Sequence, residues 1–233
     1  MINDSLDIAA ARSTLQRVGR AQIRDYLQPE AAAALERCLI QEVPWTLALR
    51  ENNVSRTLPA DELAALDTGA QLQLLERVQR AARGSYGFAY ESYMMVDAYK
   101  AGRDPDLLLH RVLEFLNGAQ HLAFLHALTG DTRIRRVSAQ ATRYRPGHFL
   151  KQHNDMHGSE GYLYAHVLNL TRDWTADWGG LLQFVDAQGA VEQTFMPRFN
   201  SLSVFRVPTD HVVSLVAPWA EDQRLAITGW YQS

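Results

Sequence analysis

The feature that most limits what this chain can fold into is a change in residue composition near Asp131. From there on, short runs rich in Val, Tyr, Phe and Thr alternate with Gly, Pro, Asn and Asp, which is typical of strands joined by turns. About eight short strands in so little chain favour a barrel or jelly roll over a parallel α/β sheet. The expected strands cover residues 137–144, 149–152, 162–170, 181–185, 191–195, 201–207, 211–216 and 224–231.

The part of the chain before Asp131 predicts helices. Apolar residues recur at helical spacing over residues 29–42, 59–84, 104–118 and 120–129, and Gly69 is a candidate break in the second run. A chain of 233 residues fits one large domain. We therefore expect an α+β fold over residues 1–233, with residues 1–130 as mainly helical support for a jelly-roll core in residues 131–233.

The composition excludes several classes of protein. With 47% hydrophobic and 21% charged residues, the chain has enough apolar material for a globular core. The net charge of −3 predicts no bulk attraction to nucleic acid. No apolar run is long enough to cross a membrane, and the start lacks the pattern of a signal peptide. Cys38 has no partner for a disulfide, so a reducing, cytoplasmic location is expected.

Three potential metal ligands lie in the strand-rich half. His153 and Asp155 are two residues apart, so both side chains would point to one face of an extended strand. His211 begins a later predicted strand. His-x-Asp alone is weak evidence, since the chain has eight histidines. Two imidazoles and one carboxylate together form the facial triad of non-haem Fe(II) oxygenases, which leaves positions open on the metal.

Arg224 opens the last predicted strand, where Thr228 and Trp230 share its face. An arginine directed into a barrel is costly unless it meets an anion, and its planar guanidinium can hold a carboxylate through two hydrogen bonds. A dicarboxylate that is also a 2-oxo acid would meet Arg224 at one end and chelate iron at the other. The alternative is an arginine on a strand face that points to solvent.

Several motifs of this half follow one another in a characteristic order. They are Tyr144-Arg145-Pro146-Gly147, His153-Asn154-Asp155, Trp178-Gly179-Gly180, Pro197-Arg198-Phe199-Asn200, His211-Val212 and the run from Arg224 to Tyr231. In this order the chain resembles the prolyl hydroxylase-like 2-oxoglutarate oxygenases, particularly the hypoxia-factor-type and ribosomal-protein prolyl hydroxylases. The resemblance covers residues 137–231. The motifs together are specific, although none is so alone.

The resemblance implies a double-stranded β-helix, the jelly roll already expected, with Fe(II) and 2-oxoglutarate at its open end. Molecular oxygen would be the second cosubstrate, and ascorbate is a candidate reductant. The implied iron ligands are His153, Asp155 and His211. The implied residues of the cosubstrate pocket are Arg224, Thr228, Tyr144, Asn169 and Trp230. Asn169 stands where relatives often have tyrosine, and its shorter amide can still donate to a carboxylate.

The implied reaction is hydroxylation of a substrate with release of succinate and CO2. By analogy with the family, the expected substrate is a prolyl residue of a protein or peptide. The alternatives are a hydroxylase of a small molecule such as a free amino acid, and a non-catalytic jelly-roll binding module. A binding module would have no need for an inward arginine, which disfavours it.

Each of three further groups of residues has two possible interpretations. The basic cluster either faces solvent or meets an acidic partner near the site mouth; its members are Arg133, Arg135, Arg136, Arg143 and Arg145. The tyrosine-rich segment from Gly84 to Lys100 supplies either core or a wall of the substrate site. Of the histidines near the triad, one could support a metal ligand while the rest lie on loops or the surface; these are His148, His157 and His166.

Overall fold

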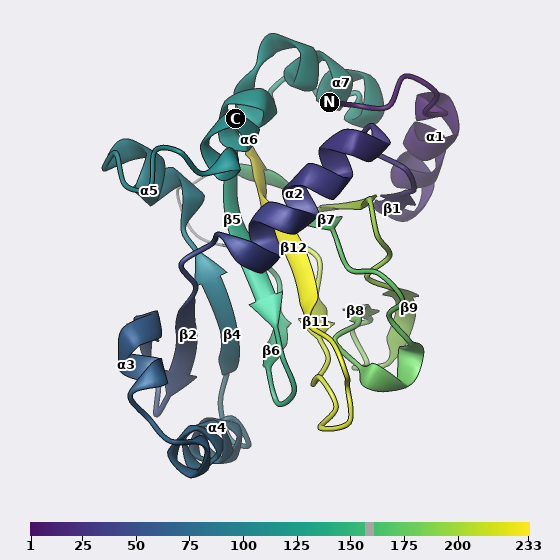
Figure 1. Ribbon diagram of the computed structural model, residues 1–233. Coiled ribbons are helices and arrows are strands. Elements are labelled where there is room, and N and C mark those ends of the chain that lie inside the picture. The colour runs from purple at the N-terminus through teal and green to yellow at the C-terminus, as the bar shows by residue number, and fades with distance from the viewer. Residues whose placement is uncertain (157–160) are drawn as a thin grey trace.

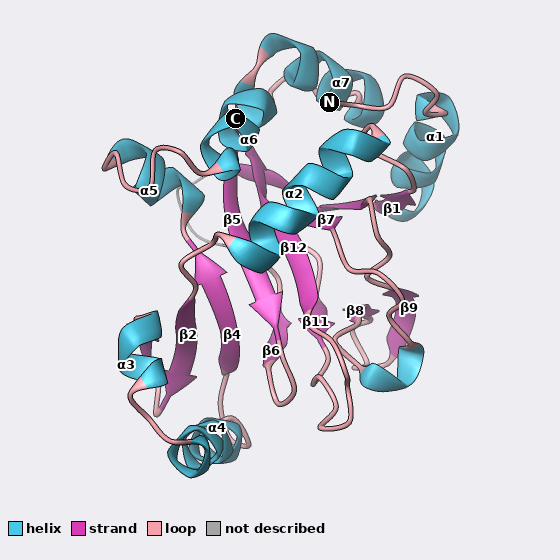
Figure 2. Ribbon diagram, in the orientation of Figure 1, coloured by secondary structure: helices cyan, strands magenta, loops and turns pink. Residues whose placement is uncertain are grey.

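The computed structural model describes residues 1–156 and 161–233, and Figures 1 and 2 show their arrangement. The helices are α1 (Ile8–Val18), α2 (Pro29–Gln41), α3 (Ala60–Ala64), α4 (Thr68–Ala81), α5 (Met95–Lys100), α6 (Leu108–Asn117), α7 (Ala119–Thr129) and the short η1 (Ala176–Trp178). The strands of the first half are β1 (Arg20–Ile23), β2 (Thr46–Glu51), β3 (Val54–Leu58) and β4 (Phe88–Tyr93). The strands of the second half are β5 (Arg136–Tyr144), β6 (Phe149–His153), β7 (Tyr162–Asn169), β8 (Leu182–Val185), β9 (Val191–Phe195), β10 (Ser201–Arg206), β11 (His211–Val213) and β12 (Arg224–Gln232).

Every strand expected after Asp131 is present as one of β5 to β12, with bounds that differ by a few residues. The largest difference is in β11, which ends at Val213 rather than Val216. Beyond Val213 the chain leaves the sheet, and the Val216 amide donates instead to the carbonyl of His148. The short runs rich in Val, Tyr, Phe and Thr between turn residues therefore located these strands well.

The first half contains more strand than its sequence predicted. The β2–β3 hairpin turns at Asn52 and Asn53, whose φ angles of 53° and 65° belong to the left-handed conformation that asparagine tolerates. Strand β4 pairs with β2, β5 and β6, so it joins the hairpin to the core sheet. Helices α1 and α5 were also not predicted. The gap at residues 65–67 between α3 and α4 divides the long helix expected over 59–84.

The strands form one antiparallel sheet that closes into a nearly complete barrel, which confirms the jelly-roll core. The order is β1-β10-β7-β12-β5-β4-β6-β11-β8-β9, with the β2–β3 hairpin beside β4. Strand β12 lies at the centre, between β5 and β7, with Arg224 opposite Tyr144 and Thr228 opposite Val167. Strands far apart in the sequence therefore bring the predicted site residues together.

The main hydrophobic core lies between the barrel and the helices that cover one of its outer faces (Figure 1). Helices α2, α6 and α7 contribute residues such as Leu35, Val112 and Leu125, all of them buried. Leu225 and Ile227 meet them from β12, so the intervening residues of that strand face the barrel interior. None of the described helices has both the length and the apolar composition needed to cross a membrane.

Two buried histidines make the stability of this core depend on pH. Burial lowers the pKa of His121 to about 4 and that of His166 to about 3. The His121 ring packs among Tyr26, Phe115 and Phe124, and these apolar surroundings disfavour its protonated form. His166 stacks on Tyr231 with ring centroids 4.9 Å apart.

We expect the free energy of unfolding to fall as the pH is lowered from about 6.5 towards 4, because the unfolded chain then binds protons that the folded chain excludes. Replacing His121 with phenylalanine should remove on the order of 1–3 kcal/mol of this pH dependence. Urea unfolding of both proteins at several pH values between 4.5 and 7.5 measures it. Identical slopes for the two proteins would contradict the assignment.

Candidate active site

His153, Asp155 and His211 converge at one end of the barrel, although they come from distant parts of the chain. His153 ends β6, and His211 begins β11 directly opposite it. The Asp155 carboxylate lies 3.3 Å from Nε2 of His153 and 3.6 Å from Nε2 of His211. One ligand atom from each residue falls within 4.8 Å of the other two. A single metal ion between them could be bound by all three.

The convergence of His153 and Asp155 has a different cause from the one expected. Strand β6 ends at His153, so the two residues do not share an extended strand. Asp155 instead adopts a φ of 58°, in the left-handed region that Asp visits more readily than most residues. This backbone turn, rather than strand alternation, directs the carboxylate towards the imidazoles.

Both imidazoles are oriented by backbone carbonyl groups. Nδ1 of His153 is 2.9 Å from the Lys151 carbonyl, and Nδ1 of His211 is 2.8 Å from the Thr209 carbonyl. A carbonyl only accepts, so Nδ1 carries the proton in each ring and the lone pair is on Nε2. Nε2 is the atom that faces Asp155 in both cases. The two rings therefore direct Nε2, the atom free to bind a metal, towards the Asp155 carboxylate.

The protonation states at this site also suit a cation. Burial lowers the pKa of His211 to about 4, with a further contribution from His153. Burial raises the pKa of Asp155, but its contacts with the two imidazoles lower it by more, so the pKa lies below its usual value. At neutral pH the site thus holds a neutral His211 and an ionised carboxylate, the forms that bind metal.

Arg224 lies inside the barrel, and no carboxylate of the described residues pairs with it. Its side chain is almost fully buried, at 2% exposure, and its guanidinium lies 5.1 Å from the centre of the Tyr144 ring. Nε and Nη1 have no hydrogen-bond partner in the described part of the chain. Burial lowers the pKa of Arg224, which reflects the cost of keeping this charge away from water. Such a cost is expected where an anionic ligand completes the site.

A cavity of about 200 Å³ connects Arg224 to the three potential ligands. Tyr144, Thr228 and Trp230, all predicted from the sequence, line it. The cavity therefore brings a cationic end and a metal-binding end into one space, which is what a 2-oxo dicarboxylate requires.

The family comparison agrees with this geometry. Residues 139–232 match the model of the 2OG-Fe(II) oxygenase superfamily. The match spans Arg224 and the three potential ligands, and it confirms the resemblance drawn from the sequence motifs. Fe(II) and 2-oxoglutarate, the cofactors of that superfamily, fit the His-Asp-His group and the unpaired arginine. No match was found among curated proteins.

Solved structures of prolyl hydroxylases share the fold across nearly the whole chain. A prolyl-4-hydroxylase of Pseudomonas putida aligns over 97% of this chain and 99% of its own, with a TM-score of 0.58 and 18% identity. A prolyl hydroxylase of Trichoplax adhaerens, in complex with a hypoxia inducible factor peptide fragment, aligns over 97% of this chain and 88% of its own, with a TM-score of 0.62 and 15% identity. These neighbours show that the chain has the fold of such enzymes, and the family match points to a 2OG-Fe(II) dioxygenase.

The fold is not restricted to prolyl hydroxylases. The non-heme alpha ketoglutarate dependent epimerase SnoN from nogalamycin biosynthesis covers 97% of this chain and 82% of its own, with a TM-score of 0.57 and 12% identity. Fold alone therefore leaves the substrate of a 2OG-Fe(II) oxygenase open.

Asn169 is the predicted pocket residue that the structure places elsewhere. It lies opposite Ala226 on β12, and its Nδ2 is 3.4 Å from the Ser201 hydroxyl. Val167, one step along the same face of β7, lines the cavity instead. Asn169 is not among the described residues that line the cavity, and its contact with the cosubstrate stays a prediction. Valine at the lining position offers no hydrogen-bond donor.

Two tyrosines of β4 and the segment before it belong to the cavity and were not in the predicted site. Tyr90 stacks on Tyr144 with ring centroids 5.1 Å apart, and the Tyr86 ring lies 6.0 Å from that of His153. Tyr93, on the opposite face of β4, belongs to the main core. The segment is therefore both core and site wall. The spacing of Tyr86, Phe88 and Tyr90 was the available signal.

The Trp178-Gly179-Gly180 turn packs against the side chain of Arg224. Gly179 has a φ of 67°, and a Cβ there would lie 2.0 Å from the Leu215 carbonyl oxygen. A Cβ on Gly180 would lie 3.5 Å from Cδ of Arg224. Glycine is thus required for close backbone approach, as the sequence suggested.

The remaining sequence candidates have structural contacts of their own. Nδ1 of His148 accepts a hydrogen bond from the Arg145 amide, and Nε2 of His166 lies 3.2 Å from the Ser138 carbonyl. His157 lies outside the described residues. The arginines do not form one face: Arg133 pairs with Asp131, whereas Arg143 and Arg145 both approach Glu91.

Proposed function

We propose that this chain is a 2-oxoglutarate- and Fe(II)-dependent oxygenase that hydroxylates a prolyl residue of a protein. In this proposal His153, Asp155 and His211 bind Fe(II), and Arg224 binds the distal carboxylate of 2-oxoglutarate. The observation that carries the proposal is the unpaired buried guanidinium of Arg224 in the same cavity as a preorganised His-Asp-His group. A buried, unpaired arginine is costly, and a His-Asp-His group alone is weak evidence for iron. A 2-oxoglutarate molecule that binds to both Arg224 and the metal would explain the two features together.

The residues around the cavity have separable roles in this reaction. The carbonyl groups of Lys151 and Thr209 hold the imidazoles in the tautomer that binds metal. Arg224 and Thr228 would fix one end of 2-oxoglutarate, so that its keto-acid end points at the metal position. When bound, Fe(II) and 2-oxoglutarate supply the oxygen chemistry that yields succinate, CO2 and a hydroxylated substrate. The aromatic wall of Tyr90, Tyr144 and Trp230 excludes water from this space.

The size of the cavity favours a large substrate that stays mostly outside. Pockets that enclose a whole small ligand usually measure roughly 300–1,000 Å³. The volume here is about 200 Å³, which a metal ion and 2-oxoglutarate would largely fill. A substrate would then present one side chain at the mouth, where Tyr86 is 40% exposed. The neighbour from Trichoplax adhaerens, solved in complex with a peptide fragment, agrees with this mode of access.

Both halves of the chain would belong to one catalytic unit of residues 1–233. Strand β4 comes from the first half, and it pairs with β5 and β6 of the jelly roll. Tyr86 and Tyr90 from the same half line the cavity. Separation of the two halves would therefore open the site. We propose a single domain on these grounds.

A small-molecule hydroxylase is the second candidate. The likeness to the epimerase SnoN from nogalamycin biosynthesis, over 97% of this chain, favours it. A small substrate would have to share the cavity with 2-oxoglutarate.

Substitutions at the two ends of the cavity should each weaken the binding of a different ligand. Arg224→Ala should weaken 2-oxoglutarate binding by at least about 100-fold, because one partner of a buried charge pair is lost, while Fe(II) affinity stays nearly unchanged. Asp155→Ala should weaken Fe(II) binding by at least about 100-fold. Anaerobic calorimetric titration of each ligand measures both.

Arg136→Ala is the matched control, since Arg136 is an exposed arginine at the far end of β5. It should leave both affinities unchanged. If Arg224→Ala bound 2-oxoglutarate as tightly as the unsubstituted protein, Arg224 would have no part in cosubstrate binding.

The substrate class is tested by succinate release. Prolyl peptides should stimulate release by at least about tenfold over the rate without substrate, and the same peptides with alanine for proline should not. Mass spectrometry should find one added oxygen atom on the prolyl peptide. Stimulation by free amino acids alone would replace the prolyl proposal with the small-molecule one, while the oxygenase assignment would stand.

A further inference from the structure

A second hollow lies on the outer side of β4 and β5, away from the catalytic cavity. Glu91 and Arg143 point into this hollow, whereas their neighbours Tyr90 and Tyr144 point into the catalytic cavity. It consists of two adjoining spaces of about 380 and 210 Å³ that share Leu63, Gln71, Glu91 and Arg145. We call it the outer groove. Its remaining walls come from α2, α3, α4 and the turn before β2.

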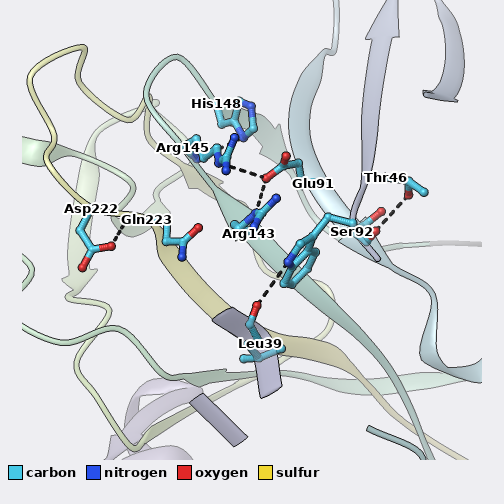
Figure 3. Close-up of polar contacts among 10 residues, drawn as sticks. Leu39, Thr46, Glu91, Ser92, Arg143, Arg145, His148, Asp222 and Gln223 are labelled. Atoms are coloured by element: carbon cyan, nitrogen blue, oxygen red, sulfur yellow. Dashed lines mark hydrogen bonds and ion pairs between the residues drawn. The ribbon is translucent and has the colours of Figure 1, made fainter. Parts of the chain in front are cut away.

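The outer groove has more positive than negative charge. Figure 3 shows Arg143 and Arg145 directed at the same carboxylate, that of Glu91. Glu91 is buried at 3% exposure, and its Oε2 contacts Nε of Arg143. Nε of Arg145 lies farther away, at 3.6 Å, and its side chain is 51% exposed. Two guanidinium groups thus share one carboxylate, which leaves one positive charge uncompensated.

Most of the guanidinium donors in the groove are unused. The Arg143 guanidinium lies 4.9 Å from the centre of the Trp45 ring, a cation–π contact that holds it in place. Within residues 1–156 and 161–233, the Nη atoms of Arg143 and Arg145 donate to no acceptor. A fixed, planar, partly buried guanidinium with free donors is well suited to bind a second carboxylate.

Apart from Thr68, Gln71 and His148, the rest of the groove is apolar. Pro44 and Trp45 form one side and Leu63 the other, and Ile40 at the edge is 48% exposed. A ligand whose carboxylate met the arginines would therefore place its remaining atoms against apolar and aromatic side chains. Burial of such atoms contributes favourable free energy roughly in proportion to their area.

We propose that the outer groove binds a carboxylate attached to an apolar or aromatic group. Two sources share this chemistry: a free aromatic acid, and the C-terminal residue of a peptide. A carboxylate fits better than a phosphate dianion, because only one positive charge is uncompensated and Glu91 already shows the geometry these arginines accept. The proposal does not depend on the metal or on 2-oxoglutarate.

The probes are 3-phenylpropionate, the neutral 3-phenylpropionamide, and a short peptide that ends in phenylalanine with a free carboxylate. Binding is followed by NMR at the indole N–H of Trp45, which is assigned by its loss in Trp45→Phe. We expect saturable shifts with 3-phenylpropionate, with the peptide, or with both, and no saturation with the amide. Which of the two acids binds more tightly identifies the source. Absence of binding by either acid, or equal binding of the amide, would overturn the proposal.

Two substitutions should change the affinity in opposite directions. Arg145→Gln removes an exposed charge and should weaken binding by at least about fivefold. Glu91→Gln removes the internal competitor for both arginines and should strengthen binding by a similar factor. If Glu91→Gln is unstable, a rise in its melting temperature on addition of 3-phenylpropionate or the peptide gives the same information. No effect of Arg145→Gln, or weaker binding by Glu91→Gln, would overturn the proposal.

Two controls locate the binding. Arg136→Gln changes an exposed arginine of the same strand outside the groove, and it should bind the probes like the unsubstituted protein. Arg224→Ala should also leave the Trp45 shifts unchanged, because Arg224 lies in the catalytic cavity. Loss of the Trp45 shifts in Arg224→Ala would show that the acids bind in the cavity and would overturn the proposal.

Discussion

The burial of Arg224 without an anion is the constraint on which the rest of the site depends. Burying a lone guanidinium costs several kcal/mol even after relaxation. The alternation of β12 directs Arg224 inward, and the glycine turn at residues 179–180 packs closely behind it. The space around Arg224 therefore has a low dielectric constant, and a carboxylate ligand bound there would offset the unfavourable free energy of burying the guanidinium. A purely structural barrel would gain more from an apolar residue at this position.

The metal end of the cavity is organised by the backbone. Two carbonyl groups set the imidazole tautomers, and the left-handed turn at Asp155 supplies the carboxylate. The loss of conformational entropy on metal binding should be small, because these groups are already in place. Arg224 on β12 and the histidines on β6 and β11 belong to one sheet, with β5 and β4 between β12 and β6, and they line one cavity. The two ends therefore act as one site rather than as two independent ones.

Sequence reasoning succeeded where a local pattern has one structural outcome. Runs rich in Val, Tyr, Phe and Thr located the strands of the second half, and the alternation of side chains along a strand placed Arg224, Thr228 and Trp230 on one face. It left the outcome open where that outcome depends on contacts between distant segments. That Val167 lines the cavity, and that Tyr86 forms part of its wall, follow from how these segments pack in the folded chain, which a local sequence pattern does not contain. The proximity of His153 and Asp155 was predicted for a different reason, since the left-handed backbone at Asp155 accompanies it.

The central claim is that one small cavity binds a metal and a 2-oxo dicarboxylate at the same time. Anaerobic addition of Fe(II) and then 2-oxoglutarate tests it most directly, because chelation of the iron by the keto acid produces a weak visible charge-transfer band. The account predicts that the band appears only with both components and is lost when succinate replaces 2-oxoglutarate. Tight binding of both ligands without any such band would contradict it.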